Sequence, residues 1–343
     1  METLDLPVIW AVILAGAVFL YVVLDGFDLG IGILFPFAGT DADRDTMMNS
    51  IAPVWDGNET WLVLGGGGLF AAFPMAYGAF MPAVYMPIGF MLTALVFRGV
   101  AFEYRFRAKG KGRTFWSRAF NLGSIIAAVS QGLILGAFIQ GTNLTGTAFA
   151  GDSFDWLSPF SLMVGLAVPV GYALLGATWL IMKSDGALAD WARSWALRCL
   201  PLVLLFMAVV SIAILFFDIQ AGQRWGISWP VINLEKLLPL APVPLAAGAL
   251  ALWLIRAVNK KSTYAPFFST VGLFALGFIG LAISLYPYIV PYRLTVWQAA
   301  AAPNSQAVLL IGVLIMLPLI LAYTAYVYWL FRGKPDTEGG YGH

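Results

Sequence analysis

The chain has 343 residues, of which 60% are hydrophobic and 11% charged, and its formal net charge is +1. This composition is far more apolar than that of an ordinary soluble domain, so it predicts an integral membrane protein. A near-neutral chain lacks the basic face that neutralises phosphates, which excludes nucleic acid as a partner. The single cysteine, Cys199, excludes a disulfide framework and any cysteine-rich zinc or iron–sulfur site.

Nine apolar runs are long enough to cross a membrane, at about 20 residues for each crossing. They lie near 6–36, 52–74, 76–102, 115–141, 158–182, 190–217, 237–256, 266–289 and 305–332. The first run is preceded by Glu2 and Asp5 and by no basic residue, so we expect a retained span rather than a secretory signal. A straight helix from Ser50 to Glu103 would be about 80 Å long, which is too long for one crossing and predicts a hairpin near Pro74.

We therefore expect an all-α integral membrane protein of about nine transmembrane helices, forming one polytopic domain over residues 1–343. The runs suggest two four-helix bundles plus one helix, with halves at 6–141 and 158–289 and the extra helix at 305–332. The two halves are too dissimilar in sequence to predict an internal repeat. The connection 218–236 contains Trp225 and Trp229, which is typical of a layer at the membrane surface.

The distribution of Lys and Arg predicts the orientation of the chain. With the N-terminus outside, fifteen basic residues fall in inside segments, three fall in outside segments, and Arg98 lies within a span. This bias favours an external N-terminus and a cytoplasmic C-terminus, in agreement with an odd number of spans. The basic segment 103–118 is then an anchor at the inner membrane surface rather than a nucleic-acid site.

Acidic residues inside the apolar runs are the main functional signal, because each costs about 2.5–3.5 kcal/mol to insert. Asp25 and Asp28 lie three apart on the first predicted helix, and Asp56 and Glu59 lie three apart on the second, so each pair shares a helix face. Repulsion and desolvation favour the protonated carboxyl, so such acids can hold and release protons near neutral pH. Arg98, on the third helix, is the available counter-ion.

Three consecutive antiparallel helices can bring these groups to one depth, with Glu103 about one turn beyond Arg98. A cluster with more acids than bases favours a path for protons or cations. The alternative for a single acid is that it caps a helix end or pairs with Arg98, and both interpretations stay open. Asn49 or Ser50 can cap the second helix, with Pro53 in its first turns.

Histidine occurs once, at His343, so no histidine lies in a predicted span to ligate a haem or a metal. Met75, Met86 and Met182 could in principle be axial ligands, but methionine usually acts as the weaker partner of a histidine, so we expect them to pack in the core. The chain has no Walker loop, GxSxG or HExxH pattern. We expect no catalytic constellation within this chain alone.

Four segments resemble subunit II of the cytochrome bd-type ubiquinol oxidases: 24–34 (LDGFDLGIGIL), 49–80 with its WDGN block, 97–107 (FRGVAFEYRFR) and 321–329 (LAYTAYVYW). The resemblance runs from end to end. The short length, and Val54 where many relatives carry a histidine before the Trp, look more like the cyanide-insensitive branch. This departure removes the basis for any role of that histidine and leaves the nearby aspartate in place.

The resemblance implies a heterodimer in a bacterial inner (cell) membrane, in which the orientation predicted from Lys and Arg makes the N-terminus periplasmic and the C-terminus cytoplasmic. Subunit I would hold two b-type haems and haem d and would oxidise ubiquinol at the outer face, while subunit II would ligate none of them. A bound quinone, lipid and small accessory membrane subunits are compatible with such a complex, and the sequence specifies none of these.

In the family, three acids belong to or border a hydrophilic route for cytoplasmic protons. They are an Asp of the WDGN block, the second Asp of DGFD and an acid in a FDYR-like block, which here are Asp56, Asp28 and Glu103. Glu103 replaces the more familiar Asp and keeps the carboxyl with a longer reach. The residues expected to give electrostatic support are Asp25, Glu59 and Arg98.

Two other functions also explain acids within the membrane. A proton-coupled secondary transporter would have broken helices and buried charges, and it would act alone and be colourless. A purely structural partner of subunit I would tolerate neutralisation of the acids.

Overall fold

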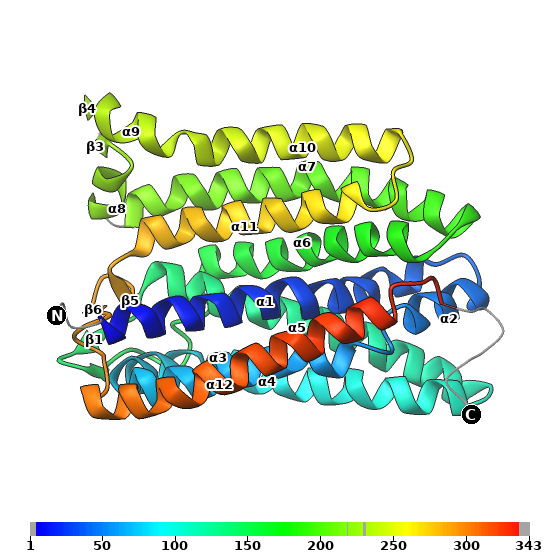
Figure 1. Ribbon diagram of the computed structural model, residues 1–343, viewed down its shortest axis with the longest axis horizontal. Helices are drawn as coiled ribbons and strands as arrows, with labels where there is room; N and C mark the ends of the chain where they lie inside the picture. Colours follow the sequence, from blue (N-terminus) through cyan, green and yellow to red (C-terminus); the bar gives the residue numbers. More distant parts are fainter. Residues whose placement is uncertain (1–4, 218, 229–230, 336–343) are drawn as a thin grey trace.

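The structure, a computed structural model, describes residues 5–217, 219–228 and 231–335; Glu2, Trp229 and His343 lie outside these ranges. Long helices run side by side between the two ends of the molecule (Figure 1). The helices are α1 (Leu6–Leu34), the 3-10 turn η1 (Phe35–Phe37), α2 (Asp41–Asn49), α3 (Trp55–Ala72), α4 (Pro74–Arg107), α5 (Lys111–Gln140), α6 (Pro159–Lys183), α7 (Gly186–Phe217), α8 (Ile219–Arg224), α9 (Leu234–Leu240), α10 (Pro242–Asn259), α11 (Ala265–Leu285) and α12 (Pro303–Leu330).

Three antiparallel strand pairs lie in the connections between the helices. They are β1 (Leu144–Thr145) with β2 (Ala148–Phe149), β3 (Ile227–Ser228) with β4 (Val231–Ile232), and β5 (Tyr288–Val290) with β6 (Leu294–Thr295). All three pairs lie at the end of the bundle where α1 begins (Figure 1). The connection that contains Trp225 folds as α8, the β3–β4 pair and α9 at this same end.

Within the described ranges, eight helical segments are long and apolar enough to cross a membrane. They are 6–37, 74–107, 111–140, 159–183, 186–217, 234–259, 265–285 and 303–330. The shorter α3 packs along α1 and supplies the remaining helix of the nine that hydropathy predicts. The all-α membrane fold is confirmed, and the predicted boundaries agree with the observed helices to within a few residues.

The chain reverses between α3 and α4, as the excessive length of a straight helix predicts. The helix α3 ends at Ala72 and α4 begins at Pro74. Arg98 of α4 nevertheless pairs with Glu59 of α3, at 3.4 Å between Nη1 and Oε2, so the two helices must fold back on each other.

Three local details of α3, α4 and α5 go beyond the sequence expectations or correct them. The helix α4 is interrupted at Val84 (φ −125°, ψ 15°), between two prolines of its own. The basic segment 103–118 is mostly helical, with a turn at 108–110, because α4 and α5 extend beyond their apolar parts. The expected cap of α3 is wrong: Val54 precedes the helix with no side-chain cap, while Ser50 donates a hydrogen bond to the carbonyl of Met47.

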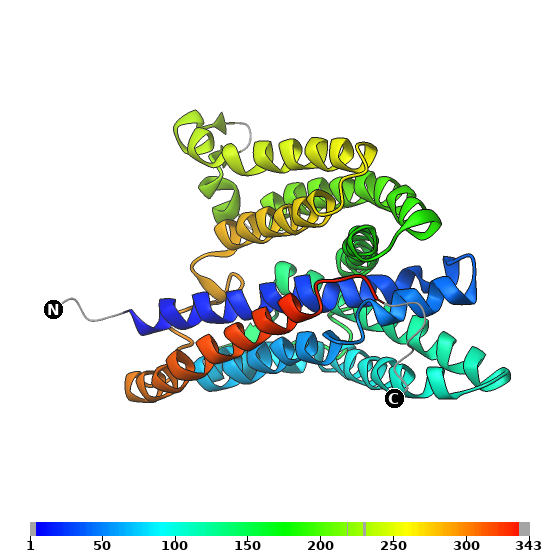
Figure 2. The ribbon, with the colours of Figure 1, turned by 45° about the vertical axis from the view of Figure 1, so that its right-hand side comes forward.

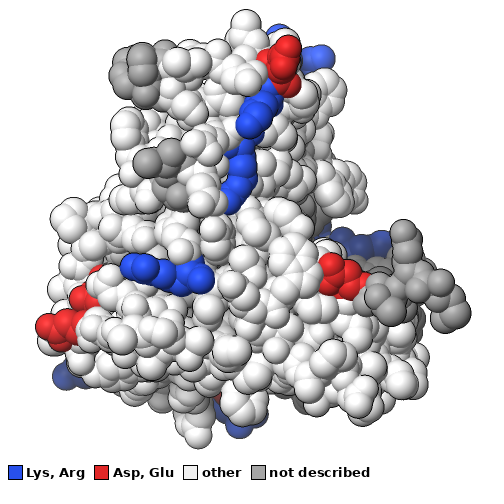
Figure 3. All heavy atoms as spheres, turned by 90° about the vertical axis from the view of Figure 1, so that its left-hand side faces the viewer, with Lys and Arg blue, Asp and Glu red and all other residues white. Residues whose placement is uncertain are grey.

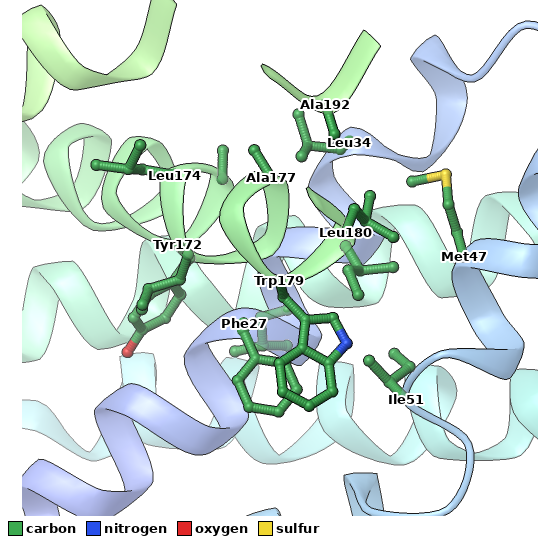
Figure 4. Close-up of a cluster of buried hydrophobic side chains, with 14 of the residues drawn as sticks. Phe27, Leu34, Met47, Ile51, Tyr172, Leu174, Ala177, Trp179, Leu180 and Ala192 are labelled. Atoms are coloured by element: carbon green, nitrogen blue, oxygen red, sulfur yellow. The ribbon is translucent and has the colours of Figure 1, made fainter. Parts of the chain in front are cut away.

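The helix α6 lies at the centre of the molecule, in contact with α1, α5, α7 and α11. In Figure 2 it separates a layer of α7, α10 and α11 from the helices α1, α3, α4, α5 and α12. The crossing of α1 and α6 requires glycine, since a Cβ on Gly30 would lie 1.8 Å from the carbonyl oxygen of Tyr172. Beside it, Phe27 stacks on Trp179 with ring centroids 4.0 Å apart, and this contact centres the main apolar core (Figure 4).

Candidate functional site

Four charged side chains from three helices meet inside the bundle. The guanidinium of Arg98 (α4) lies 3.1 Å from Asp25 Oδ1 and 3.7 Å from Asp28 Oδ2, both on α1, and 3.4 Å from Glu59 Oε2 on α3. Asp25, Asp28 and Arg98 are fully buried, whereas the Glu59 side chain is 29% exposed. The three-residue spacing on α1 turns both aspartates toward the same arginine.

The surroundings of Arg98 keep it in place and shield it from solvent. The rings of Trp55 and Phe102 stack on each other at 4.8 Å, and the guanidinium carbon lies 5.5 Å and 5.6 Å from their centroids. The helix α5 approaches closely at Gly123, where a Cβ would lie 2.7 Å from the carbonyl of Ala94 and 3.0 Å from the Arg98 Cβ. A larger residue at 123 would displace the arginine.

The cluster has more negative than positive groups. Three carboxyls share one guanidinium, and Asp25 Oδ2, Asp28 Oδ1 and Arg98 Nε have no hydrogen-bond partner in the described structure. One arginine cannot compensate three ionised carboxyls, two of them fully buried and one partly buried, because each uncompensated buried charge carries a large desolvation penalty. The cluster therefore favours retention of at least one exchangeable proton, and its free carboxyl oxygens are where that proton can sit.

One neutral extension of the cluster runs across α1, α5 and α6. Tyr21 lies one helical turn before Asp25 and accepts a hydrogen bond of 2.8 Å from Gln131 Nε2. Tyr172 donates to Gln131 Oε1 at 2.5 Å. A glutamine amide thus joins two tyrosine hydroxyls within the membrane-spanning part of the bundle.

A second neutral extension runs from Asp28 to the last helix. Asn58 on α3 donates from Nδ2 to Asp28 Oδ2 at 2.8 Å, and its Oδ1 accepts a hydrogen bond of 2.7 Å from the hydroxyl of Tyr328. These partners are not among the residues predicted from the sequence. Gln131 and Asn58 are amides within apolar runs, which is a usable signal, but tyrosines are too frequent in this chain for Tyr328 to stand out.

Two of the acids assigned from the sequence lie apart from the cluster. Asp56 is exposed and lies in the first turn of α3, where a negative charge is favourable for the helix dipole. Glu103 is also exposed and pairs with Arg107, one turn further along α4, at 3.6 Å. Of the six assigned residues, the structure brings together Asp25, Asp28, Glu59 and Arg98.

A separate ionic network joins α2 to the turn between α4 and α5. Asp45 Oδ1 lies 2.6 Å from Arg105 Nη1, and Asp45 Oδ2 lies 2.8 Å from Arg113 Nη2. The side chain of Arg105 is fully buried over the ring of Phe35, with 5.0 Å between the guanidinium carbon and the centroid. This network fastens α2 over the end of the bundle at which α1 ends.

Comparison with known proteins identifies the family of this chain. Residues 6–331 match the family described as cytochrome bd terminal oxidase subunit II. The chain belongs to the cytochrome bd terminal oxidase subunit II family. It is 30% identical over 363 residues to cytochrome bd-I ubiquinol oxidase subunit 2 of Escherichia coli (strain K12), covering 96% of this chain and 95% of that protein. It is 29% identical over 336 residues to cytochrome bd ubiquinol oxidase subunit 2 of Bacillus subtilis (strain 168), covering 95% and 96%.

A solved structure has the same fold. The bd oxidase from Geobacillus thermodenitrificans matches with a TM-score of 0.76 at 19% identity, over 96% of this chain and 99% of that one. The resemblance stated from the four segments is confirmed at the level of the family, and the membrane location follows from the family and the apolar helices. Assignment to the cyanide-insensitive branch stays a prediction.

Membership of this family implies haems in the complex and a subunit I partner. The described residues of this chain contain no histidine, and among them no group of three His, Cys, Asp or Glu could hold a metal ion. Cys199 is buried in the apolar core, while Met75 is exposed on the outer surface of α4.

Proposed function

We propose that this chain supports the haem-bearing subunit I of a quinol:oxygen oxidoreductase and contributes a cytoplasmic proton path for the reduction of oxygen to water. The observation that carries the proposal is the group of three carboxyls, two of them fully buried, around one buried arginine. Such a group is expensive within a membrane and has no structural requirement for the excess acids. A reaction that consumes protons beside this chain supplies the reason for them.

The exposed fractions of the acids support an order along the path. Asp56 is exposed at the start of α3, Glu59 lies one turn further on and is partly exposed, and Asp25 and Asp28 are fully buried. A proton entering at Asp56 would pass through Glu59 and water to the buried pair. Glu103, exposed on α4, is a second acid at the surface. Arg98 keeps a carboxylate available as an acceptor between transfers.

The charge distribution supports entry from the cytoplasm. Few basic side chains lie at the end of the bundle where α1 begins (Figure 3). The basic residues of the other end lie in and beside the connections that follow α1, α4, α6, α10 and α12. By the positive-inside rule that other end faces the cytoplasm, and it is the end nearer to the start of α3 and Asp56.

The outer surfaces of α3 and α12 support contact with subunit I. Val63 and Phe70 of α3 are 73% and 61% exposed, and Leu314 of α12 is 64% exposed. Gly66 and Gly67 on α3 have open space where a Cβ would lie, so a helix of another subunit can approach closely there. On assembly these apolar surfaces would exchange their contact with lipid for contact with subunit I, which is consistent with the supporting role.

The alternative is a proton-coupled secondary transporter, and visible absorption separates the two functions. The complex is isolated in mild detergent through a tag on this chain. We expect a coloured preparation that oxidises ubiquinol with oxygen, and no Soret band when the chain is expressed without subunit I. A colourless, folded chain that moves a solute with protons, or a stoichiometric haem retained by the isolated chain, would contradict the proposal.

A further inference from the structure

The last helix reaches the buried cluster through one hydrogen-bonded pair. The hydroxyl of Tyr328 on α12 lies 2.7 Å from Asn58 Oδ1, and Asn58 Nδ2 lies 2.8 Å from Asp28 Oδ2. Asn58 is 1% exposed and Asp28 is fully buried, so water does not compete freely for these bonds. The contact joins residues that are 270 positions apart in the chain.

The direction of these hydrogen bonds is set by the acceptors around Asn58. Its Nδ2 lies within hydrogen-bond distance of two oxygens, Asp28 Oδ2 and the carbonyl of Leu24 at 3.3 Å. Both are acceptors when Asp28 is ionised, so the amide must turn its NH₂ group toward them. Its Oδ1 then faces α12 and can only accept, which makes the hydroxyl of Tyr328 the donor.

The amide in turn makes the two oxygens of Asp28 different. Asp28 Oδ2 accepts from Asn58 and is the oxygen nearer to Arg98, at 3.7 Å from Nη2. Asp28 Oδ1 has no partner in the described structure. Two positive or donating groups at Oδ2 disfavour protonation there, so a proton taken up by Asp28 goes to Oδ1.

Contacts at the end of α12 hold Tyr328 in place, although among the described residues of that helix Gln306 alone is buried. The ring of Tyr328 stands edge-on to Trp179, with centroids 6.2 Å apart and an interplanar angle of 86°. Lys183, on α6 with Trp179, donates to the carbonyl of Phe331 and, at 3.0 Å, to that of Gly333. These bonds fix the last turn of α12 against α6.

We propose that Tyr328 is a positioning residue of the proton path, which acts through Asn58 to keep Asp28 Oδ2 occupied and Oδ1 free as the proton-accepting atom. The inference rests on the proposed function, since it assumes that Asp28 carries protons. It assigns a role in this reaction to α12, the helix that lies outside the two groups of four in the sequence.

The test uses Tyr328→Phe in the intact two-subunit complex, which removes the donating hydroxyl and keeps the ring against Trp179. We expect normal haem content, an unchanged KM for ubiquinol, and an oxygen turnover lowered about 3- to 10-fold, the factor that one neutral hydrogen bond is worth. The matched control is Tyr326→Phe on the same helix, whose ring is 56% exposed; it should turn over like the unmutated complex.

A double-mutant cycle separates positioning from packing. If Tyr328 acts through Asn58, then Tyr328→Phe in an Asn58→Leu background causes no further loss, whereas independent packing effects add. Asn58→Leu also serves if Tyr328→Phe does not assemble, and in that variant an unchanged turnover overturns the inference.

The inference and the proposed function fail in different ways. Suppose that Asp28→Asn is impaired. If the haem-loaded Tyr328→Phe complex then keeps its kcat, or if the losses in the cycle are fully additive, the inference is wrong and the proposed function stands. Unaltered turnover in a haem-loaded Asp28→Asn complex overturns the proposed proton path and the inference with it.

Discussion

Replacement of Arg98 by leucine should disable assembly of the complex, because it leaves acids in the bundle without a counter-ion. The guanidinium is fully buried and lies 3.1, 3.7 and 3.4 Å from the carboxyls of Asp25, Asp28 and Glu59. Breaking a buried pair by removal of one partner costs about 3–5 kcal/mol, which lowers the ratio of folded to unfolded chain roughly a hundredfold or more. The loss is measured as haem-loaded complex recovered per unit of membrane.

Two controls show whether charge or packing is responsible. Arg107→Leu removes an arginine whose side chain is 81% exposed, with a single 3.6 Å pair to Glu103, and Lys109→Leu removes an exposed lysine. Exposed pairs contribute at most about 1 kcal/mol, so both variants should assemble.

The decisive variant combines Arg98→Leu with Asp25→Asn and Asp28→Asn. Removing the two fully buried acids along with the base eliminates most of the uncompensated charge, so assembly should recover in large part while oxygen turnover stays low. If Arg98→Leu assembles as well as Arg107→Leu, or if the triple variant assembles no better than Arg98→Leu, the electrostatic account of the cluster is wrong.

Two further substitutions test the path and the packing that positions it. The Asp56→Asn complex should assemble but reduce oxygen more slowly, and Asp56→Glu should recover part of the rate. If the Asp56→Asn complex turned over at the unmutated rate, the only role left for Asp56 would be to stabilise the first turn of α3. Gly30→Leu should prevent assembly, because a Cβ there would lie 1.8 Å from the Tyr172 carbonyl oxygen. Gly16→Leu on the same helix should be tolerated, because a Cβ there would have nothing within 4 Å. Recovery of normal complex from Gly30→Leu would refute the close crossing of α1 and α6.

The helices could be predicted from the sequence because the membrane imposes their length. About 20 apolar residues are needed for each crossing, and the excessive length of a single run predicts the reversal at Pro74. The sequence does not predict the polar helix α2, because residues 41–49 carry no apolar periodicity and the position of the helix depends on the Asp45 pairs with Arg105 and Arg113.

The charged centre could be predicted in part. Opposite charges on consecutive antiparallel helices at similar depth indicate the meeting of Asp25, Asp28 and Glu59 with Arg98. The rotation of each helix about its axis decides which acids point inward, and hydropathy does not specify this rotation for helices that are apolar all round. For this reason the exposed position of Asp56, outside the cluster, could not be predicted from the sequence. The pairing of Asn58 with Tyr328 depends on how α12 docks, which no local pattern encodes.

The most direct test of the central claim is the behaviour of Asp28→Asn in a complex with its full haem content. The asparagine keeps the shape of the aspartate and removes the exchangeable carboxyl proton. Steady-state oxygen reduction, which consumes protons, is compared with the reduction of the haems by ubiquinol in the absence of oxygen. We expect oxygen turnover to fall by about 10²-fold, the lower range for loss of a positioned proton-transfer group, while anaerobic haem reduction keeps its unmutated rate. Oxygen turnover at the unmutated rate, or an equal loss in both measurements, would contradict a proton path through this cluster.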